Sequence, residues 1–311
     1  MADCKLDTSW VLIEPDDPVM GSDMVDISKI TRKWLDVPYS DVSPSQVLDI
    51  YLPEEGEGPF PTYIFIHGGA FFAGDKQDVQ FLLAVEGVNR GYAVVSIEYR
   101  KAFESKAPNA LYDVKSAIRF LRKNAAKYNL DPEKFALGGD SAGAYYAVFA
   151  AATSKIKAFD GPSPVLSEVS GDVQAVVAQC GCYDLLCLTP PPDVEEALLN
   201  SPEPPVIPPN LMTIFVGVNL HKIPDVAVLL NPLTYITEDF PPTLVQVGRN
   251  DSIVPCTESE NLAEKLKSCG VQVLFELNDG WDHCALNHIL TPDWFRQANY
   301  DRVFGFLDEV L

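Results

Sequence analysis

The sequence has little positive charge. It contains 23 Lys and Arg residues against 44 Asp and Glu residues, which gives a formal net charge of −21 at pH 7. Proteins that bind nucleic acids or anionic membrane surfaces usually present clustered basic groups. The charge balance therefore argues against both kinds of partner, and we attribute most of the excess acid to a solvated surface.

Long apolar segments are also missing. The chain has no run of about 18 apolar residues, which a membrane-spanning helix would need. The first residues, M-A-D-C-K-L-D, carry an acid where a secretory signal has basic and then apolar residues, so we expect a cytoplasmic protein. Neither a long linker nor an internal repeat divides the chain. We therefore expect a single domain over residues 1–311.

Groups that bind metals are few. The chain has 4 histidines and 7 scattered cysteines, without an H-E-x-x-H motif. Cys180 and Cys182 form C-x-C rather than C-x-x-C, and no second pair follows at zinc spacing. Because Cys180 ends the apolar run 173–178, we predict a buried free thiol there. We expect neither a metal nor a cofactor.

The segment around Ser141 has the pattern of a nucleophile elbow. Residues 135–137 are apolar, G-D-S-A-G follows at 139–143, and an alanine-rich run comes next. G-x-S-x-G between a buried strand and a helix presents its serine on a sharp turn. The two glycines remove side chains that would crowd this turn, and the serine lies near the positive end of the helix. The pattern predicts that Ser141 is a catalytic nucleophile.

A second glycine-rich turn follows another buried strand. The apolar run 62–66 leads directly into H-G-G at 67–69. Backbone N–H groups in such a turn can point into a cavity and stabilise the negative oxygen of a tetrahedral intermediate. A phosphate-binding loop is the alternative, but it would need a Lys-Ser or Lys-Thr pair, which does not follow here. We therefore favour an oxyanion loop.

Strands and helices alternate along most of the chain. Apolar patterning predicts strands at 32–37, 47–52, 62–66, 92–97, 134–137, 173–179, 243–247 and 271–277, and helices at 79–90, 110–127, 142–154, 258–268 and 294–310. Such alternation favours a mostly parallel sheet flanked by helices, with the active site at the carboxyl ends of the strands. Both glycine-rich motifs would lie at that edge.

Residues 183–240 interrupt this alternation. The segment is rich in proline yet too apolar for a disordered linker, and helical patches at 193–200 and 224–230 lie within it. We predict that it packs over the strand ends as a small cap, together with residues 1–30. A surface excursion without function is the alternative.

A serine nucleophile needs a base. His67 belongs to the H-G-G turn and His221 lies in the predicted cap, whereas His283 follows the last predicted strand at the expected end of the sheet. We therefore assign His283 as the base, in preference to His288 in a later turn.

The base in turn needs an orienting acid. Asp251 follows a predicted strand, and the chain order Ser141, Asp251, His283 is that of α/β-hydrolases. Asp279 and Asp282 share the loop of the base and would not bridge two strands, so we prefer Asp251.

These motifs resemble a known family. H-G-G at 67–69, Tyr-Arg at 99–100, G-D-S-A-G at 139–143 and Asn-Asp at 250–251 with Val-Pro at 254–255 are similar to the hormone-sensitive-lipase-like branch of the α/β-hydrolases, over roughly residues 34–310. The resemblance implies the α/β-hydrolase fold and hydrolysis of carboxylic esters by a Ser-His-Asp triad. It also implies an oxyanion hole from the backbone of Gly68, Gly69 and Ala142.

The residues near these motifs suggest a compact substrate. Phe71 and Phe72 follow the oxyanion glycines, Tyr145 lies one helical turn beyond the elbow, and Asp140 precedes the serine. We assign all of them to substrate binding and expect acetyl to hexanoyl esters to be preferred. The alternative is that the aromatic residues belong to the core.

Three functions compete. A carboxylesterase acting on a small-molecule ester is favoured, and an arylformamidase-like amide hydrolase is the first alternative. The second is a non-catalytic ligand-binding homologue similar to the plant gibberellin receptor, which has lost the catalytic histidine that this chain has at His283. Whether the protein forms a homodimer stays open.

Overall fold

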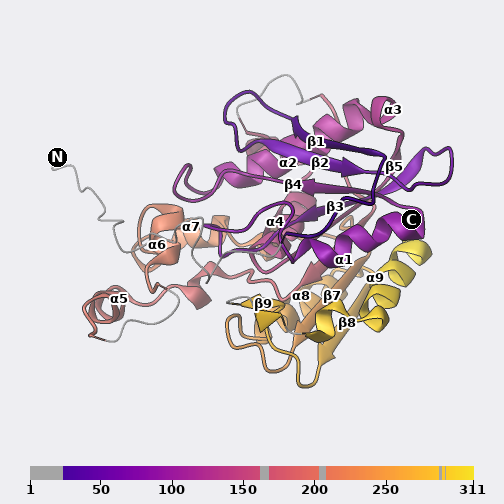
Figure 1. The fold of residues 1–311 in the computed structure, drawn as a ribbon. Helices are drawn as coiled ribbons and strands as arrows, with labels where there is room; N and C mark the ends of the chain where they lie inside the picture. Colours follow the sequence, from indigo (N-terminus) through magenta and orange to yellow (C-terminus); the bar gives the residue numbers. More distant parts are fainter. Residues whose placement is uncertain (1–23, 162–167, 203–207, 287–288, 291) are drawn as a thin grey trace.

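A computed structural model describes residues 24–161, 168–202, 208–286, 289–290 and 292–311 (Figure 1). The greater part of the predicted N-terminal cap, residues 1–23, and the alternative base His288 lie outside the described residues. No helix within the described ranges combines the length and the apolar character needed to cross a membrane.

One large sheet forms the centre of the molecule. Its strands are β1 (Lys33–Pro38), β2 (Val47–Tyr51), β3 (Phe60–Ile66), β4 (Ala93–Ile97), β5 (Leu130–Asp140), β6 (Ala175–Gln179), β7 (Thr243–Gly248) and β8 (Val273–Asn278). The 8 strands are ordered β1-β2-β4-β3-β5-β6-β7-β8. β2 runs antiparallel to both β1 and β4, and all the other neighbours are parallel. The expectation of a mostly parallel sheet is confirmed.

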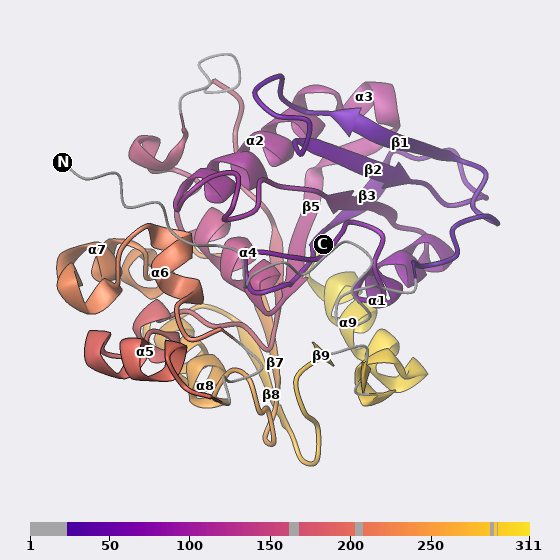
Figure 2. The ribbon, with the colours of Figure 1, turned by 60° about the vertical axis from the view of Figure 1, so that its left-hand side comes forward.

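Helices cover both faces of the sheet. They are α1 (Phe81–Val85), α2 (Asn109–Lys123), α3 (Ala125–Tyr128), α4 (Ala142–Ala152), α8 (Thr257–Ser268) and α9 (Gln297–Val310). Three further helices, α5 (Pro192–Leu199), α6 (Leu211–Val216) and α7 (Pro224–Leu229), lie to one side of the sheet (Figures 1 and 2). Short 3-10 turns include η1 (Glu86–Arg90), η4 (Leu185–Leu188) and η7 (Pro292–Phe295), and β9 (Ala285–Leu286) pairs with β10 (Ile289–Leu290).

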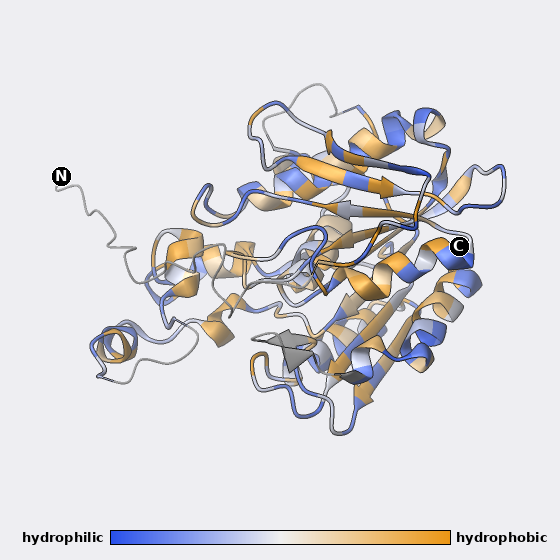
Figure 3. Cartoon of the chain, viewed as in Figure 1, coloured by the Kyte–Doolittle hydropathy of each residue, from blue (hydrophilic) through white to orange (hydrophobic). Residues whose placement is uncertain are grey.

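The two faces follow from the alternation of side chains along each strand. In β3, Ile64 and Ile66 pack in one apolar cluster with α2, α4 and α8, whereas Tyr63 and Phe65 pack in another with α1 and α9. Figure 2 shows these two groups of helices on opposite sides of the sheet. Figure 3 shows apolar residues along much of the sheet, with polar segments among them. Every residue of β4, β6 and β7 is buried, as expected for central strands covered on both faces.

Several element boundaries differ from the predictions. β5 begins at Leu130 rather than 134, because Leu130 pairs with Phe60 before the apolar core of the strand starts. The last helix begins at Gln297, after the 3-10 turn η7. α6 was not predicted, since its short sequence L-M-T-I-F-V has no helical periodicity.

The described parts of residues 183–240 gather at one side of the sheet, where α5, α6 and α7 lie near each other in both views (Figures 1 and 2). Phe215 of α6 stacks on Phe71 with 4.2 Å between ring centroids, and its carbonyl accepts the N–H of Ala107 at 2.9 Å. The Tyr145 hydroxyl donates to the carbonyl of Leu230 at 2.8 Å. The segment is therefore anchored to α4 and to the loop that follows β3.

Candidate active site

Ser141 stands on a strained turn between β5 and α4. Its backbone has φ 52° and ψ −119°, a conformation that costs energy for any residue with a side chain. A Cβ atom at Gly143 or Gly139 would overlap the carbonyl oxygen of Ile66 in the neighbouring strand. The Ser141 N–H donates to the carbonyl of Gln179 at 2.9 Å, which ties the turn to β6. The glycines of the motif are thus required by close backbone packing.

An aspartate and a histidine meet beyond the last strands. His283 Nδ1 lies 2.8 Å from Asp251 Oδ2, and the two side chains are 4% and 0% exposed. Asp251 Oδ1 accepts the N–H groups of Ile253 at 2.9 Å and Val254 at 2.8 Å. With one carboxylate oxygen held by the backbone, the other is fixed toward the imidazole.

The two weaker acid candidates face elsewhere. Asp279 pairs with Arg249 at 2.5 Å on the surface. Asp282 Oδ1 accepts backbone N–H groups from Ser252 at 2.8 Å and from His283 at 2.7 Å. Asp282 therefore shapes the loop that carries the histidine, whereas Asp251 contacts the ring.

The loop that carries His283 contacts the elbow through Cys284, the residue that follows the histidine. The Cys284 thiol donates to Asp140 Oδ2 at 2.8 Å, and Asp140 immediately precedes Ser141. Burial, reinforced by the nearby Cys180 thiol, raises the pKa of Asp140 to about 8. Asp140, which we had assigned to substrate binding, is 4% exposed and instead joins the elbow to its neighbouring loops.

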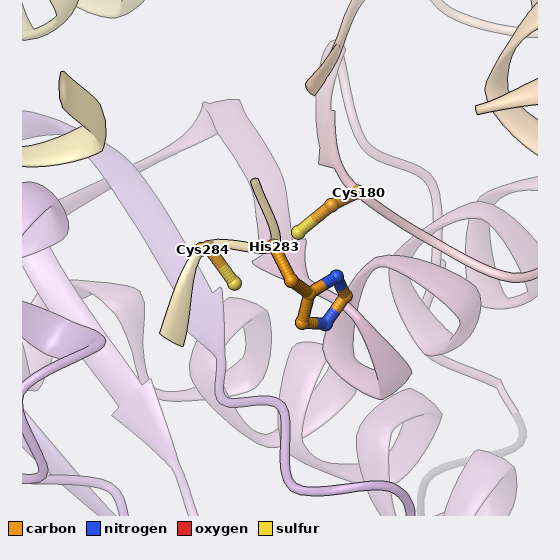
Figure 4. A group of neighbouring side chains, drawn as sticks. All are labelled: Cys180, His283 and Cys284. Carbon is orange, nitrogen blue, oxygen red and sulfur yellow. The ribbon is translucent and has the colours of Figure 1, made fainter. Parts of the chain in front are cut away.

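Cys180 lies beside the histidine ring (Figure 4). Burial opposes the charged form of His283, but the Cys180 thiol and the Asp251 carboxylate favour it, so the pKa of His283 lies well above its usual value. Burial likewise opposes a Cys180 thiolate, yet a hydrogen bond from Cys284 and the imidazolium outweigh it and lower the pKa of Cys180 to about 6. Sequence reasoning identified Cys180 as a buried thiol but missed its position against the base.

The H-G-G turn differs in detail from the prediction. The Gly68 N–H, assigned to the oxyanion hole, already donates to Gln80 Oε1 at 2.6 Å and to Asp140 Oδ1 at 3.2 Å. Within the described part of the chain, the N–H groups of Gly69, Ala70 and Ala142 donate no hydrogen bond. Gly69 and Ala70 have φ of 109° and 53°, so the chain turns sharply at these two residues. Their free donors make them better candidates than Gly68.

A buried polar cluster holds this turn. His67 Nδ1 lies 2.7 Å from the carbonyl of Gly68, and its ring stacks on Tyr99 with 4.5 Å between centroids. The Tyr99 hydroxyl donates to the His67 carbonyl at 3.0 Å. His67 thus positions the loop, which agrees with its exclusion as the base.

The aromatic residues assigned to the substrate cleft are mostly core. Phe71 is 2% exposed and stacked on Phe215, and Tyr145 is 1% exposed with its hydroxyl bonded to Leu230. Phe72 packs edge-on against Phe103, which is 47% exposed. The prediction that Phe71 and Tyr145 line a cleft is therefore not supported, because both side chains are buried in contacts with residues 183–240.

A serine on a strained elbow and a buried Asp-His pair, both at the carboxyl edge of a mostly parallel sheet, define an α/β-hydrolase site. The profile of the BD-FAE family matches residues 48–266, and the chain belongs to this family of hormone-sensitive-lipase-like α/β-hydrolases.

Similar proteins carry esterase names. The chain is 28% identical to the probable carboxylic ester hydrolase LipM of Mycobacterium tuberculosis over 76% of this chain and 52% of that protein. It is 29% identical to the probable isoprenylcysteine alpha-carbonyl methylesterase ICMEL1 of Arabidopsis thaliana over 80% of this chain and 50% of that protein. The chain thus spans about half the length of these curated relatives.

A solved structure is similar over nearly its whole length. It is a truncated form of a carbohydrate esterase from gut microbiota, 27% identical, with a TM-score of 0.77 over 92% of this chain and 98% of that chain.

Proposed function

We propose that this protein is a serine carboxylesterase that hydrolyses small or short-chain carboxylic esters. The observation that carries the proposal is the buried 2.8 Å contact between Asp251 and His283, on a loop that also contacts the residue preceding Ser141. A carboxylate in this position selects the tautomer in which Nε2 is the proton acceptor. The esterase names of the relatives support the same chemistry.

The proposed reaction has two halves. His283 Nε2 takes the proton of the Ser141 hydroxyl while the serine oxygen attacks the ester carbonyl. The tetrahedral intermediate collapses to an acyl-serine, and the protonated His283 gives its proton to the departing alcohol. Water, deprotonated by the same histidine, then releases the carboxylic acid and restores Ser141. Asp251 stays ionised and stabilises the imidazolium in both halves.

Backbone N–H groups would stabilise the developing oxyanion. We assign this role to Gly69, Ala70 and Ala142, whose donors are not engaged in the described part of the chain. Gly68 would instead hold the loop in place through Gln80 and Asp140. No cofactor or metal takes part in this mechanism.

The cap and its contacts favour compact acyl groups. Phe215 from residues 183–240 packs on Phe71 directly after the oxyanion loop, and we infer that this stack limits the length of acyl chain that the site accepts. A net charge of −21 also disfavours docking to an anionic lipid interface. We therefore propose monomeric esters in solution as substrates, with acetyl to hexanoyl groups preferred.

A carbohydrate is a candidate for the alcohol part of the ester. This candidate rests on the likeness to the gut carbohydrate esterase, which covers 98% of that chain. A neutral sugar ester would meet no repulsion from the acidic surface.

The test is kcat/KM across p-nitrophenyl acetate, butyrate, octanoate and palmitate, with acetylated xylose and N-formylkynurenine assayed beside them. We expect a maximum at acetate or butyrate and none of the activity in Ser141→Ala. A maximum at palmitate, or a jump in rate above the critical micelle concentration, would contradict the short-chain proposal. Faster cleavage of N-formylkynurenine than of any ester would replace the esterase by an arylformamidase.

A further inference from the structure

Two thiols that the esterase mechanism does not use form a cluster with the proposed catalytic imidazole. The Cys180 and Cys284 sulfur atoms and a ring nitrogen of His283 all lie within 4.8 Å of one another (Figure 4). The three residues are 0%, 4% and 4% exposed. They come from different parts of the chain, since Cys180 follows β6 and the other two lie in the loop after β8.

These groups are the donors of a tetrahedral site for a thiophilic cation. Zn–S bonds of about 2.3 Å and Zn–N bonds of about 2.0 Å place ligand atoms roughly 3.5 Å apart. Side-chain movements of about 1 Å would therefore bring the cluster to coordination distance. Thiolate and imidazole together select Zn²⁺ and similar soft cations over Mg²⁺ or Ca²⁺.

Cys284 also contacts a carboxylate and a small cavity on its other side. Asp140 Oδ2 lies 2.8 Å from the Cys284 sulfur. A cavity with room for about one water molecule adjoins both residues and is lined further by Gln80, Leu83, Gln179, Trp294 and Phe295.

We propose that Cys180, His283 and Cys284, with water as fourth ligand, form an inhibitory site for a thiophilic divalent cation such as Zn²⁺ or Cd²⁺. On binding, the two thiols release their protons to solvent, and an imidazole nitrogen donates its lone pair to the metal. Coordination through Nδ1 would break the contact with Asp251, and coordination through Nε2 would occupy the proton acceptor. Inhibition rests on the proposed role of His283, whereas binding does not.

A second cysteine group provides the control. The sulfur atoms of Cys182 and Cys187 are 3.5 Å apart, and Glu258 Oε2 is 4.0 Å from the former. That carboxylate oxygen already accepts the N–H groups of Tyr183 at 2.9 Å and Asp184 at 2.7 Å. Because Cys187 is exposed, Cys187→Ser removes this competing group with little cost to the core.

The experiment titrates Cd²⁺ into the full-length Cys187→Ser protein in the presence of a phosphine reductant. Thiolate-to-cadmium charge-transfer absorption reports binding, and hydrolysis of p-nitrophenyl acetate reports activity. We expect one equivalent to bind, both signals to share a midpoint, and EDTA to restore activity. A second substitution, Cys284→Ser or Cys180→Ser, should raise the Cd²⁺ concentration at the midpoint of the absorption change at least about 100-fold.

A second measurement uses the wild-type chain, so its result does not depend on whether the serine variants fold. Bound Cd²⁺ should slow alkylation of Cys284 in the wild-type chain at least about tenfold, read from the peptide masses.

Absence of the charge-transfer band, an unchanged midpoint in Cys284→Ser, or unprotected Cys284 would overturn the site. Binding without loss of activity would overturn its inhibitory role. If the metal-free protein hydrolysed no ester, the proposed function would fail, and the absorption titration would still decide whether the metal site exists.

Discussion

The elbow and the cap segment obtain their shapes in different ways. At the elbow, Gly139 and Gly143 pack against the backbone of Ile66, so no other residue fits without displacing a strand. Residues 183–240 instead form short helices between prolines, held by side-chain contacts such as that of Phe215 with Phe71. The edge that carries the proposed catalytic residues is therefore shaped by backbone sterics, whereas the predicted cap is shaped by side-chain packing that can vary. We expect changes at the elbow to affect mainly kcat, and changes in residues 183–240 to affect mainly substrate preference.

Removing the base should have the largest effect. His283→Ala should lower kcat by about 10⁴-fold or more, and Asp251→Asn by about 10³–10⁴-fold, because the members of a triad act as one unit. Steady-state kinetics on p-nitrophenyl butyrate measures both. The control is Asp279→Asn, which should stay within about twofold of wild type because Asp279 only pairs with Arg249 on the surface. A crippled Asp279→Asn, or an active His283→Ala, would refute the assignment.

Crowding the elbow should cost stability as well as activity. Gly143→Ala places a methyl group against the Ile66 carbonyl, and we expect a loss of more than about 2 kcal/mol or of soluble protein. Gly305→Ala is the matched control. No heavy atom lies within 4 Å of a Cβ at this helical position, so the change should stabilise by up to about 1 kcal/mol. Equal melting temperatures for the two variants would show that the elbow is not sterically fixed.

The same contrast explains what the sequence could predict. Glycines beside Ser141, apolar strands and the loops that follow them are local patterns, and they located the sheet, Asp251 and His283. Three features depend on tertiary contacts and were missed. The Gly68 N–H is engaged by Gln80, Phe71 turns into the core, and Cys180 lies against the base. Ala70, the next residue after the two glycines, was the one sequence signal for the oxyanion donors that we propose.

A change in the cap should affect binding more than chemistry. Phe215→Leu retains an apolar side chain but loses the ring stack on Phe71. We expect KM for p-nitrophenyl butyrate to change a few-fold, with kcat within about twofold, because the triad keeps its geometry. The ratio of octanoate to butyrate activity should rise as the space beside Phe71 opens. A kcat loss near that of His283→Ala would erase the distinction between the two regions.

The pH profile offers the finest test of the base. The raised pKa of His283 keeps the ring protonated at low pH, and only the neutral ring accepts the serine proton. Activity should therefore be lost as pH falls through that raised value, so the acid limb of kcat/KM should have its midpoint above about 6.5. Cys180, Asp251 and Asp140 all interact with the ring. Cys180→Ser should move the acid limb to lower pH. An acid limb at the same pH as in the wild type would show that Cys180 does not raise the pKa of His283.

Covalent labelling of the nucleophile tests the central claim most directly. The protein is incubated with an organophosphate such as diethyl p-nitrophenyl phosphate, and the modified peptide is identified by mass spectrometry. We expect one phosphoryl group on Ser141, esterase activity lost in proportion to labelling, and neither adduct nor activity in a folded Ser141→Ala variant. An adduct on another residue, or full activity in protein labelled completely at Ser141, would contradict the account.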